Sequence, residues 1–207
     1  MSALASLEVE DLACVRGPRA LFKNLNFRLE AGGALVVEGP NGSGKTSLLR
    51  MLAGFLPPAA GTIFLRTDAG EFSDVEERGK HIGWFAHQDG LKPQLTAKEN
   101  LSFFARLYGS DGDAEAALAW AGLSHAADFP AQYLSAGQKK RLALARLKSS
   151  KRPLWLLDEP FAALDVDGKK RVEQMLAEHC AGGGMAVVAT HEAMTLEAAK
   201  LVLGEFR

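Results

Sequence analysis

The chain has 207 residues, of which 47% are hydrophobic, and it is long enough to form one sizeable domain with a buried core. Its formal net charge of -1 indicates no basic surface of the kind that binds nucleic acid, so we expect no nucleic-acid partner. Two isolated cysteines, no signal-peptide pattern and no apolar run near the ~20 residues that span a bilayer indicate a soluble protein in a reducing compartment.

Strand patterns recur along the chain. Residues 7–12 and 25–30 alternate apolar and polar side chains, which is typical of half-buried antiparallel strands. Short, largely apolar segments, which are typical of buried parallel strands, lie at 34–39, 81–86, 153–158 and 185–190. Because helical runs separate these apolar segments, we predict an α/β fold with a mainly parallel core sheet and an antiparallel β subdomain.

The segment GPNGSGKT at 39–46 carries the clearest chemistry. It follows an apolar strand and opens a helix, and its glycines let the backbone wrap so that successive N–H groups face phosphates. Lys45 can then reach the β- and γ-phosphates, while the Thr46 hydroxyl can ligate Mg²⁺. A glycine-rich turn without a ligand is the alternative. The residues that we assign to nucleotide binding here are Gly39, Pro40, Asn41, Gly42, Ser43, Gly44, Lys45, Thr46 and Ser47.

Helix signals without a strand fill the residues from about 96 to 133. Thr96 and Glu99 have the spacing of a capping box before a helix, and a second helix is predicted near 113–121. We therefore expect a helical subdomain at 91–135 inside one domain that spans 1–207.

A further capping box, made by Ser135 and Gln138, predicts the start of a basic helix. A helix start with unpaired N–H groups favours an anion, although capping boxes begin ordinary helices far more often than they bind ligands. The adjacent cluster Lys139-Lys140-Arg141 is interpreted as solvated charge on the helix surface.

Asp158 and Glu159 follow the apolar segment 153–158. A strand-end aspartate can hold Mg²⁺ through water, and a neighbouring carboxylate can accept a proton from an attacking water. Taken alone, an acidic pair at a strand end is as readily structural as catalytic. Because the phosphate-binding segment at 39–46, a P-loop, precedes this pair in the sequence, we assign Asp158 to the metal and Glu159 to catalysis.

The segment LSAGQ at 134–138, together with the P-loop and the acidic pair, resembles the ATP-binding cassette (ABC) ATPases, whose signature is typically LSGGQ. The resemblance implies an ABC-type P-loop NTPase that binds ATP and Mg²⁺ and hydrolyses ATP. In that family two cassettes pair head to tail. Ser135, Gly137 and Gln138 would then contact ATP held by the P-loop of a second subunit in a homodimer.

Other landmarks of the family follow in order along the sequence. Gln88 resembles the glutamine that contacts Mg²⁺ and the attacking water, and His191 resembles the switch histidine on the γ-phosphate. Asp165 belongs to a segment resembling the loop by which the two ATP sites communicate. Taken singly, Gln88 and His191 would be ordinary loop residues. Arg16 stands where the family usually stacks an aromatic ring on adenine; a guanidinium plane can stack on a base, and an ordinary surface arginine is the alternative.

Three longer segments, HQDGLKPQLTAKENL, YLSAGQKKRLALARL and LWLLDEPFAALDVDG, resemble the ATPase subunit of the cytochrome c maturation heme exporter. That resemblance implies a peripheral subunit on the cytoplasmic face of the inner membrane, where ATP-driven dimer closure acts on separate integral membrane subunits. No residue has a physical tie to heme, so the ATPase of another ABC importer or exporter with unrelated cargo is the alternative.

In related cassettes the helical subdomain receives a short helix of the membrane subunit. Apolar side chains that could line such a cleft are Leu101, Phe103, Phe104 and Leu107. Packing inside the subdomain's own core is the alternative for each of them.

Overall fold

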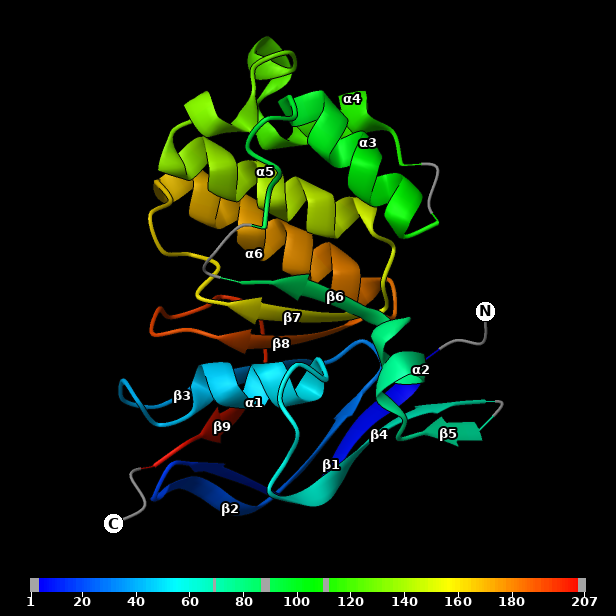
Figure 1. Ribbon diagram of the computed structural model, residues 1–207, viewed down its shortest axis with the longest axis vertical. Helices are drawn as coiled ribbons and strands as arrows, with labels where there is room; N and C mark the ends of the chain where they lie inside the picture. The colour runs from blue at the N-terminus through cyan, green and yellow to red at the C-terminus, as the bar shows by residue number, and fades with distance from the viewer. Residues whose placement is uncertain (1–3, 69, 87–89, 110–111, 205–207) are drawn as a thin grey trace.

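The computed structural model describes residues 4–68, 70–86, 90–109 and 112–204, and two sheets form its centre (Figure 1). The larger sheet has five parallel strands in the order β6-β7-β8-β3-β9. Its strands are β3 (Ala34–Glu38), β6 (Ile82–Phe85), β7 (Leu154–Asp158), β8 (Met185–Ala189) and β9 (Ala199–Val202). The four apolar segments predicted as buried parallel strands are therefore confirmed, and β9 adds an edge strand that the sequence reasoning missed.

The second sheet is antiparallel, with the order β2-β1-β4-β5. Its strands are β1 (Leu4–Arg16), β2 (Arg19–Glu30), β4 (Ala60–Thr67) and β5 (Gly70–Phe72). The predicted strands at 7–12 and 25–30 lie within β1 and β2, which pair from Ser6 opposite Glu30 to Arg16 opposite Arg19. The antiparallel β subdomain is confirmed, with two more strands than the alternation pattern indicated.

Helix α1 (Lys45–Leu52) lies in the main core, which the two sheets share. Its side chains Leu48, Leu49 and Leu52 are completely buried among residues of both sheets. Full burial of one leucine side chain stabilises a fold by about 1.5–3 kcal/mol. The three leucines therefore fix α1 firmly, and with it the loop that connects β3 to its first turn. The short helix α2 (Val75–Gly79) begins at Asp74, whose side chain accepts from two backbone N–H groups.

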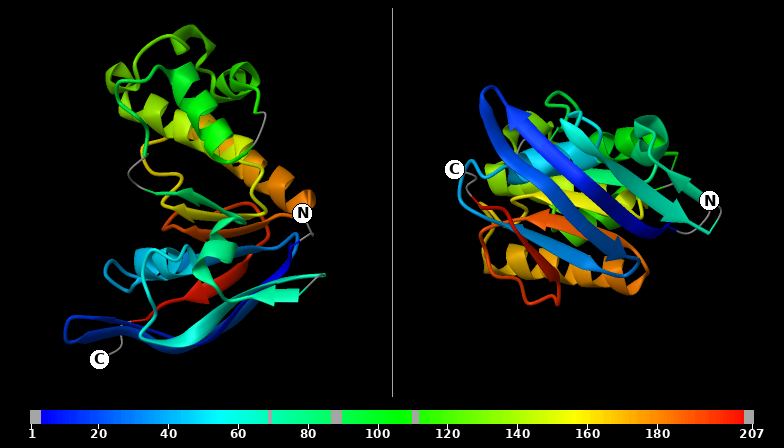
Figure 2. Two further views of the ribbon diagram at one scale, coloured as in Figure 1. Left: turned by 45° about the vertical axis from the view of Figure 1, so that its right-hand side comes forward. Right: turned by 90° about the horizontal axis from the view of Figure 1, so that it is seen from below.

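Two long helices, α5 (Ala136–Ser149) and α6 (Val166–Ala181), lie on the side of the parallel sheet away from the antiparallel sheet (Figure 2). A second core joins them to the sheet, with Leu144, Met175 and Leu176 packed against strand residues such as Trp155. The predicted capping box is present at α5: the Gln138 N–H donates to Ser135 Oγ at 3.2 Å, and the Ser135 N–H donates to Gln138 Oε1 at 2.8 Å.

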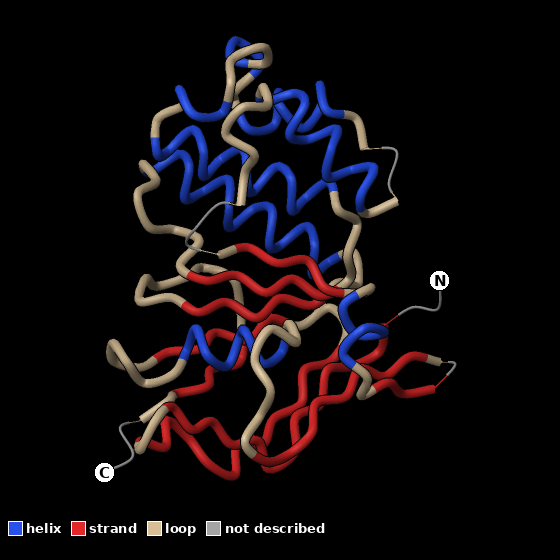
Figure 3. Tube along the Cα trace, in the orientation of Figure 1, coloured by secondary structure: helices blue, strands red, loops and turns tan. Residues whose placement is uncertain are grey.

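A layer of helices only lies beyond α5, at the end of the molecule away from the antiparallel sheet (Figure 3). It contains α3 (Ala97–Leu107), α4 (Ala114–Ala121) and the single 3₁₀ turns Ser124–Ala126 and Ala131–Tyr133. Both predicted helices are confirmed, and the predicted capping box begins α3. No helix in the described ranges combines the length and apolar character that crossing a membrane requires.

Candidate functional site

The P-loop connects the end of β3 to the start of α1. Gly39 adopts a φ of 147°, and a Cβ there would lie 2.4 Å from the carbonyl oxygen of Leu203, so only glycine fits. Gly44 is the N-cap of α1 with a φ of 104°, and among the described residues no side chain caps this helix and no acidic residue lies in its first turn. A helix start of this kind carries partial positive charge and unpaired N–H groups that favour an anion.

The Lys45 side chain spans this loop. Its Nζ donates to the carbonyl oxygens of Gly39 at 2.7 Å and Pro40 at 3.2 Å, and it lies 3.1 Å from Nε2 of His191. Lys45 is 8% exposed, so its ammonium group is held where the loop curves. A buried cation beside unpaired N–H groups is suited to phosphate.

Thr46 and Asp158 bring two oxygen atoms together although they are far apart in the sequence. The Thr46 hydroxyl donates to Asp158 Oδ2 at 2.9 Å, and Asp158 ends β7 with 7% of its surface exposed. The described residues contain no group of three or more His, Cys, Asp or Glu side chains that could hold a metal ion by themselves. Two protein oxygens completed by phosphate oxygens and water are typical of Mg²⁺ in nucleotide sites, so the pair fits this ion.

Glu159 and His191 follow the neighbouring strands β7 and β8, and their side chains lie close to each other. Glu159 has a left-handed φ of 49°, and its N–H donates to the carbonyl oxygen of Ala189 at 2.8 Å. Nε2 of His191 lies 3.4 Å from Glu159 Oε1 and 3.1 Å from Asn41 Oδ1. The geometry therefore places a carboxylate and an imidazole next to the loop that Lys45 spans.

These side chains line a cavity of about 300 Å³ beyond the carboxyl ends of β3 and β7. Ligands of open α/β sheets bind in this position. The lining residues are Arg16, Leu21, Asn41, Gly42, Gly44, Lys45, Thr46, Ser47, Asp158, Glu159 and His191. All of them except Leu21 were singled out from the sequence. Leu21 was missed because β2 begins at Arg19, earlier than the alternation pattern indicated.

Seven other predicted residues that the structure describes do not line this cavity. Three of them, Gly39, Pro40 and Ser43, belong to the P-loop itself, and the other four lie at two helix starts. Ser135, Gly137 and Gln138 form the start of α5, and Asp165 caps α6 by accepting from the Gly168 N–H at 2.8 Å. Ser135 and Asp165 are exposed, so both helix starts are accessible from outside the molecule. Gln88 lies outside the described residues.

Lys140 is a residue that the sequence reasoning misjudged. Its Nζ donates to the carbonyl oxygen of Glu159 at 2.7 Å and to that of Ala162 at 2.6 Å, so the interpretation as solvated charge is wrong for Lys140. Burial lowers the pKa of Lys140, and the nearby carboxylates of Glu159, Glu192 and Asp158 oppose that shift. Its position five residues after Ser135 gives no signal of this contact, which depends on how α5 packs against the loop after β7.

A P-loop before a buried helix, a buried lysine across that loop and a strand-end Asp-Glu pair on a parallel sheet define a P-loop nucleotide hydrolase. The family model described as "ABC transporter" matches residues 22–162. The chain therefore belongs to the ABC transporter family, as an ATPase, and the predicted ABC-type fold is confirmed.

Similar curated proteins are named Cytochrome c biogenesis ATP-binding export protein CcmA. The relative from Rhodopseudomonas palustris is 47% identical over 195 residues, which cover 93% of this chain and 95% of the relative. The relative from Paramagnetospirillum magneticum is 46% identical over 201 residues, which cover 95% of this chain and 92% of that one.

Solved structures agree on the fold. A putative ABC transporter ATP-binding protein from Pyrococcus furiosus has a TM-score of 0.82 at 21% identity and covers 96% of this chain and 98% of its own. An ATP-binding cassette solved as a dimer, in a post-hydrolysis state bound to ADP and Pi, has a TM-score of 0.77 at 27% identity and covers 90% of this chain and 88% of its own.

Proposed function

We propose that the chain is the ATP-hydrolysing subunit of a transporter for cytochrome c biogenesis and heme export, in which closure of an ATP-bound dimer acts on separate membrane subunits. The observation that carries this proposal is 47% identity to a cytochrome c biogenesis ATP-binding export protein along 93% of the chain. One cavity is lined by a phosphate-binding group (Lys45), by metal-binding groups (Thr46 and Asp158) and by the proposed general base (Glu159). This combination supports an ATPase that hydrolyses ATP rather than a cassette that only binds it.

Within this proposal the whole chain, 1–207, forms one nucleotide-binding domain, and its side chains divide the chemistry. The start of α1 and the Lys45 ammonium hold the phosphates. Thr46 and Asp158 hold Mg²⁺, which supplies charge neutralisation on the phosphates when bound. Glu159 accepts the proton of the attacking water, and His191, 3.4 Å from its carboxylate, contacts the γ-phosphate.

Arg16 and Gln88 complete the proposed site. Arg16 lines the cavity beside Leu21 at the end of β1, where its guanidinium plane could stack on adenine. Gln88 is proposed as a ligand of Mg²⁺ and of the attacking water, on the family resemblance alone.

The helix start at Ser135 is proposed to bind ATP held by a second copy of the chain. Ser135, Gly137 and Gln138 do not line their own subunit's cavity, and Ser135 is exposed. Asp165, exposed at the start of α6, would carry contacts between the two sites of that homodimer. A similar solved cassette is a dimer with ADP and Pi bound, which supports this arrangement.

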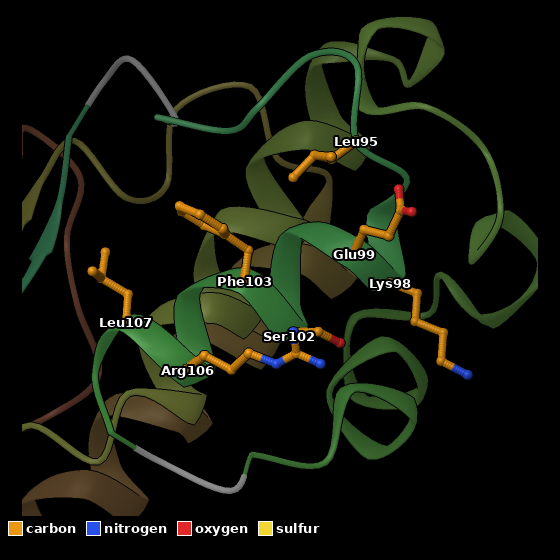
Figure 4. A pocket seen from close by; sticks show the side chains of 7 residues that line it. All are labelled: Leu95, Lys98, Glu99, Ser102, Phe103, Arg106 and Leu107. Carbon is orange, nitrogen blue, oxygen red and sulfur yellow. The ribbon is translucent and has the colours of Figure 1, made fainter.

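The membrane partner is proposed to dock on a groove along α3, with the chain held on the cytoplasmic face of the inner membrane. The groove has a volume of about 730 Å³ (Figure 4), and its lining residues are Leu95, Lys98, Glu99, Ser102, Phe103, Arg106 and Leu107. Phe103 and Leu107 lie on the same side of α3 and are 42% and 63% exposed. Leu101 and Phe104, the other two candidates from the sequence, are buried. An apolar floor with a polar rim suits a short helix of a membrane subunit.

Placing charge in this groove should break the complex. Because removing a central apolar anchor typically costs at least about 2 kcal/mol of binding energy, Phe103→Asp with Leu107→Asp should reduce co-purification with the native membrane subunits more than about tenfold. The matched control is Phe129→Asp, which charges another exposed phenylalanine (56% exposed) outside the groove and should leave co-purification intact. Equal recovery of the membrane subunits by both proteins would contradict the docking proposal.

The cellular role is tested with a strain that carries Glu159→Gln as the only copy. Because hydrolysis is proposed to do mechanical work on the membrane subunits rather than chemistry on heme, this strain should still make heme and b-type cytochromes. It should fail to mature c-type cytochromes and should accumulate a heme-loaded carrier upstream. Heme-stained gels of membrane and periplasmic fractions measure this. Normal c-type cytochromes together with another transport defect would leave the ATPase in place and contradict the role in cytochrome c biogenesis.

A further inference from the structure

The turn after β7 carries the proposed base in an unfavourable backbone conformation. Glu159 and Ala163 are both in the left-handed region, with φ values of 49° and 61°. Residues other than glycine adopt this region at a cost and remain there only where surrounding groups hold them. Two such residues within one turn indicate that something fixes the turn from outside.

The holding groups come from two other elements. On the side of the sheet, the N–H of Glu159 donates to the carbonyl oxygen of Ala189 at 2.8 Å. On the side of α5, the Lys140 ammonium donates to the carbonyl oxygens of Glu159 at 2.7 Å and Ala162 at 2.6 Å. Lys140 thus bridges the turn from its first residue to its fourth.

The surroundings of Lys140 keep its ammonium in this bridge. Lys140 is half-buried, and its Nζ lies 5.7 Å from the centre of the Phe85 ring at the end of β6. A partly desolvated ammonium makes stronger hydrogen bonds to carbonyl oxygens than a solvated one, and the ring face adds favourable charge contact. Neighbouring Lys139 instead donates to the carbonyl oxygen of Gln132 at 3.2 Å, away from this turn.

We propose that Lys140 is a positioning residue that holds Glu159 in the orientation needed to accept a proton from the attacking water. This inference rests on the proposed role of Glu159 as the base. Lys140 touches the backbone of Glu159, so it acts through this residue. Because Lys140 lies on the helix that begins at Ser135, the orientation of Glu159 is also tied to the helix that would meet the partner's ATP.

The test replaces Lys140 with methionine, which keeps the length of the side chain and removes its donors. Of the two hydrogen bonds lost, only the one to the Glu159 carbonyl touches the proposed base directly. One hydrogen bond from a charged group contributes a factor of about 10 to 100, so kcat for ATP hydrolysis should fall about 10- to 100-fold. KM for ATP should stay within about threefold of wild type, because the phosphate-binding groups are untouched. ATP should still drive dimer formation, and the dimer should persist because hydrolysis is slow. Lys140→Arg, which restores donors to the two carbonyls, should recover most of the lost rate.

Lys139→Met is the matched control, since it removes one positive charge from the same turn of α5 and should leave kcat unchanged. The inference is overturned if Lys140→Met hydrolyses ATP at the wild-type rate. It is equally overturned if Lys140→Met and Lys140→Gln lose ATP binding and melt early, because Lys140 would then only stabilise the fold. Activity retained in Glu159→Gln is a separate outcome, which would instead contradict the role of the base.

Discussion

Replacing Glu159 with glutamine should lower the rate of ATP hydrolysis about 10²- to 10⁴-fold, the usual contribution of a general base. Glutamine has nearly the same size and shape as glutamate. It should therefore keep the contact with His191, whose Nε2 lies 3.4 Å from Oε1 of Glu159 in the wild-type protein. It removes only the ability to accept a proton, so the affinity for ATP should remain close to that of wild type. Phosphate release and equilibrium binding of a fluorescent ATP analogue measure the two quantities separately.

The same variant should accumulate a dimer in ATP, which light scattering after size exclusion detects. Adding Ser135→Arg to it should abolish this dimer, since a bulky side chain would replace the cap of α5 at the proposed contact with the partner's ATP. Glu178→Gln is the matched control for both assays, because Glu178 pairs with Lys148 at 2.7 Å and does not line the cavity.

If Glu159→Gln hydrolyses ATP at more than about a tenth of the wild-type rate, Glu159 is not the base.

Strand prediction succeeded where burial dictates the sequence. β3, β7 and β8 are covered on both faces, and such strands must be apolar throughout, which a short segment shows without any knowledge of the fold. β9 lies at the edge of the same sheet, and most of its residues are exposed, so Lys200 can interrupt its apolar residues and the strand is not apolar throughout. The same limit explains β4, whose first residues are exposed.

The candidate site was predictable to the extent that each of its parts is local. The P-loop, the acidic pair and the capping box at Ser135 each have a spacing fixed by one turn of backbone. That these parts come together in one cavity depends on the tertiary fold. Thr46 and Asp158, which form a hydrogen bond, are 112 residues apart in the sequence, and Lys45 and His191 are 146 apart. The family resemblance predicted that these residues share one site, whereas no sequence feature predicted the contact of Lys140. Its contact with Glu159 follows only from the packing of α5 beside the turn after β7.

Replacing Lys45 with alanine should remove ATP binding itself. Lys45 is 8% exposed as a whole residue, and its ammonium group is held at the P-loop by the carbonyl oxygens of Gly39 and Pro40, at 2.7 and 3.2 Å. Lys45 is the first residue of α1, where the unpaired N–H groups of the helix would meet the phosphates. Hydrogen bonds to charged groups contribute about 1.5–3 kcal/mol each, so losing two of them to the phosphates should raise the Kd for ATP at least about 100-fold.

Isothermal titration calorimetry with ATP and Mg²⁺ measures this loss, and Lys148→Ala is its control. Lys148 pairs with Glu178 at the far end of α5, so the control removes one lysine without touching the cavity and should keep the wild-type Kd. Lys45→Ala should also fail to dimerise in ATP, even when combined with Glu159→Gln, because the partner's helix start would have no phosphate to meet. A Kd within about threefold of wild type would mean that the N–H groups of the loop hold ATP without the lysine. The contrast between Lys45→Ala, which should lose binding, and Glu159→Gln, which should keep it, separates phosphate binding from the chemical step within a single cavity.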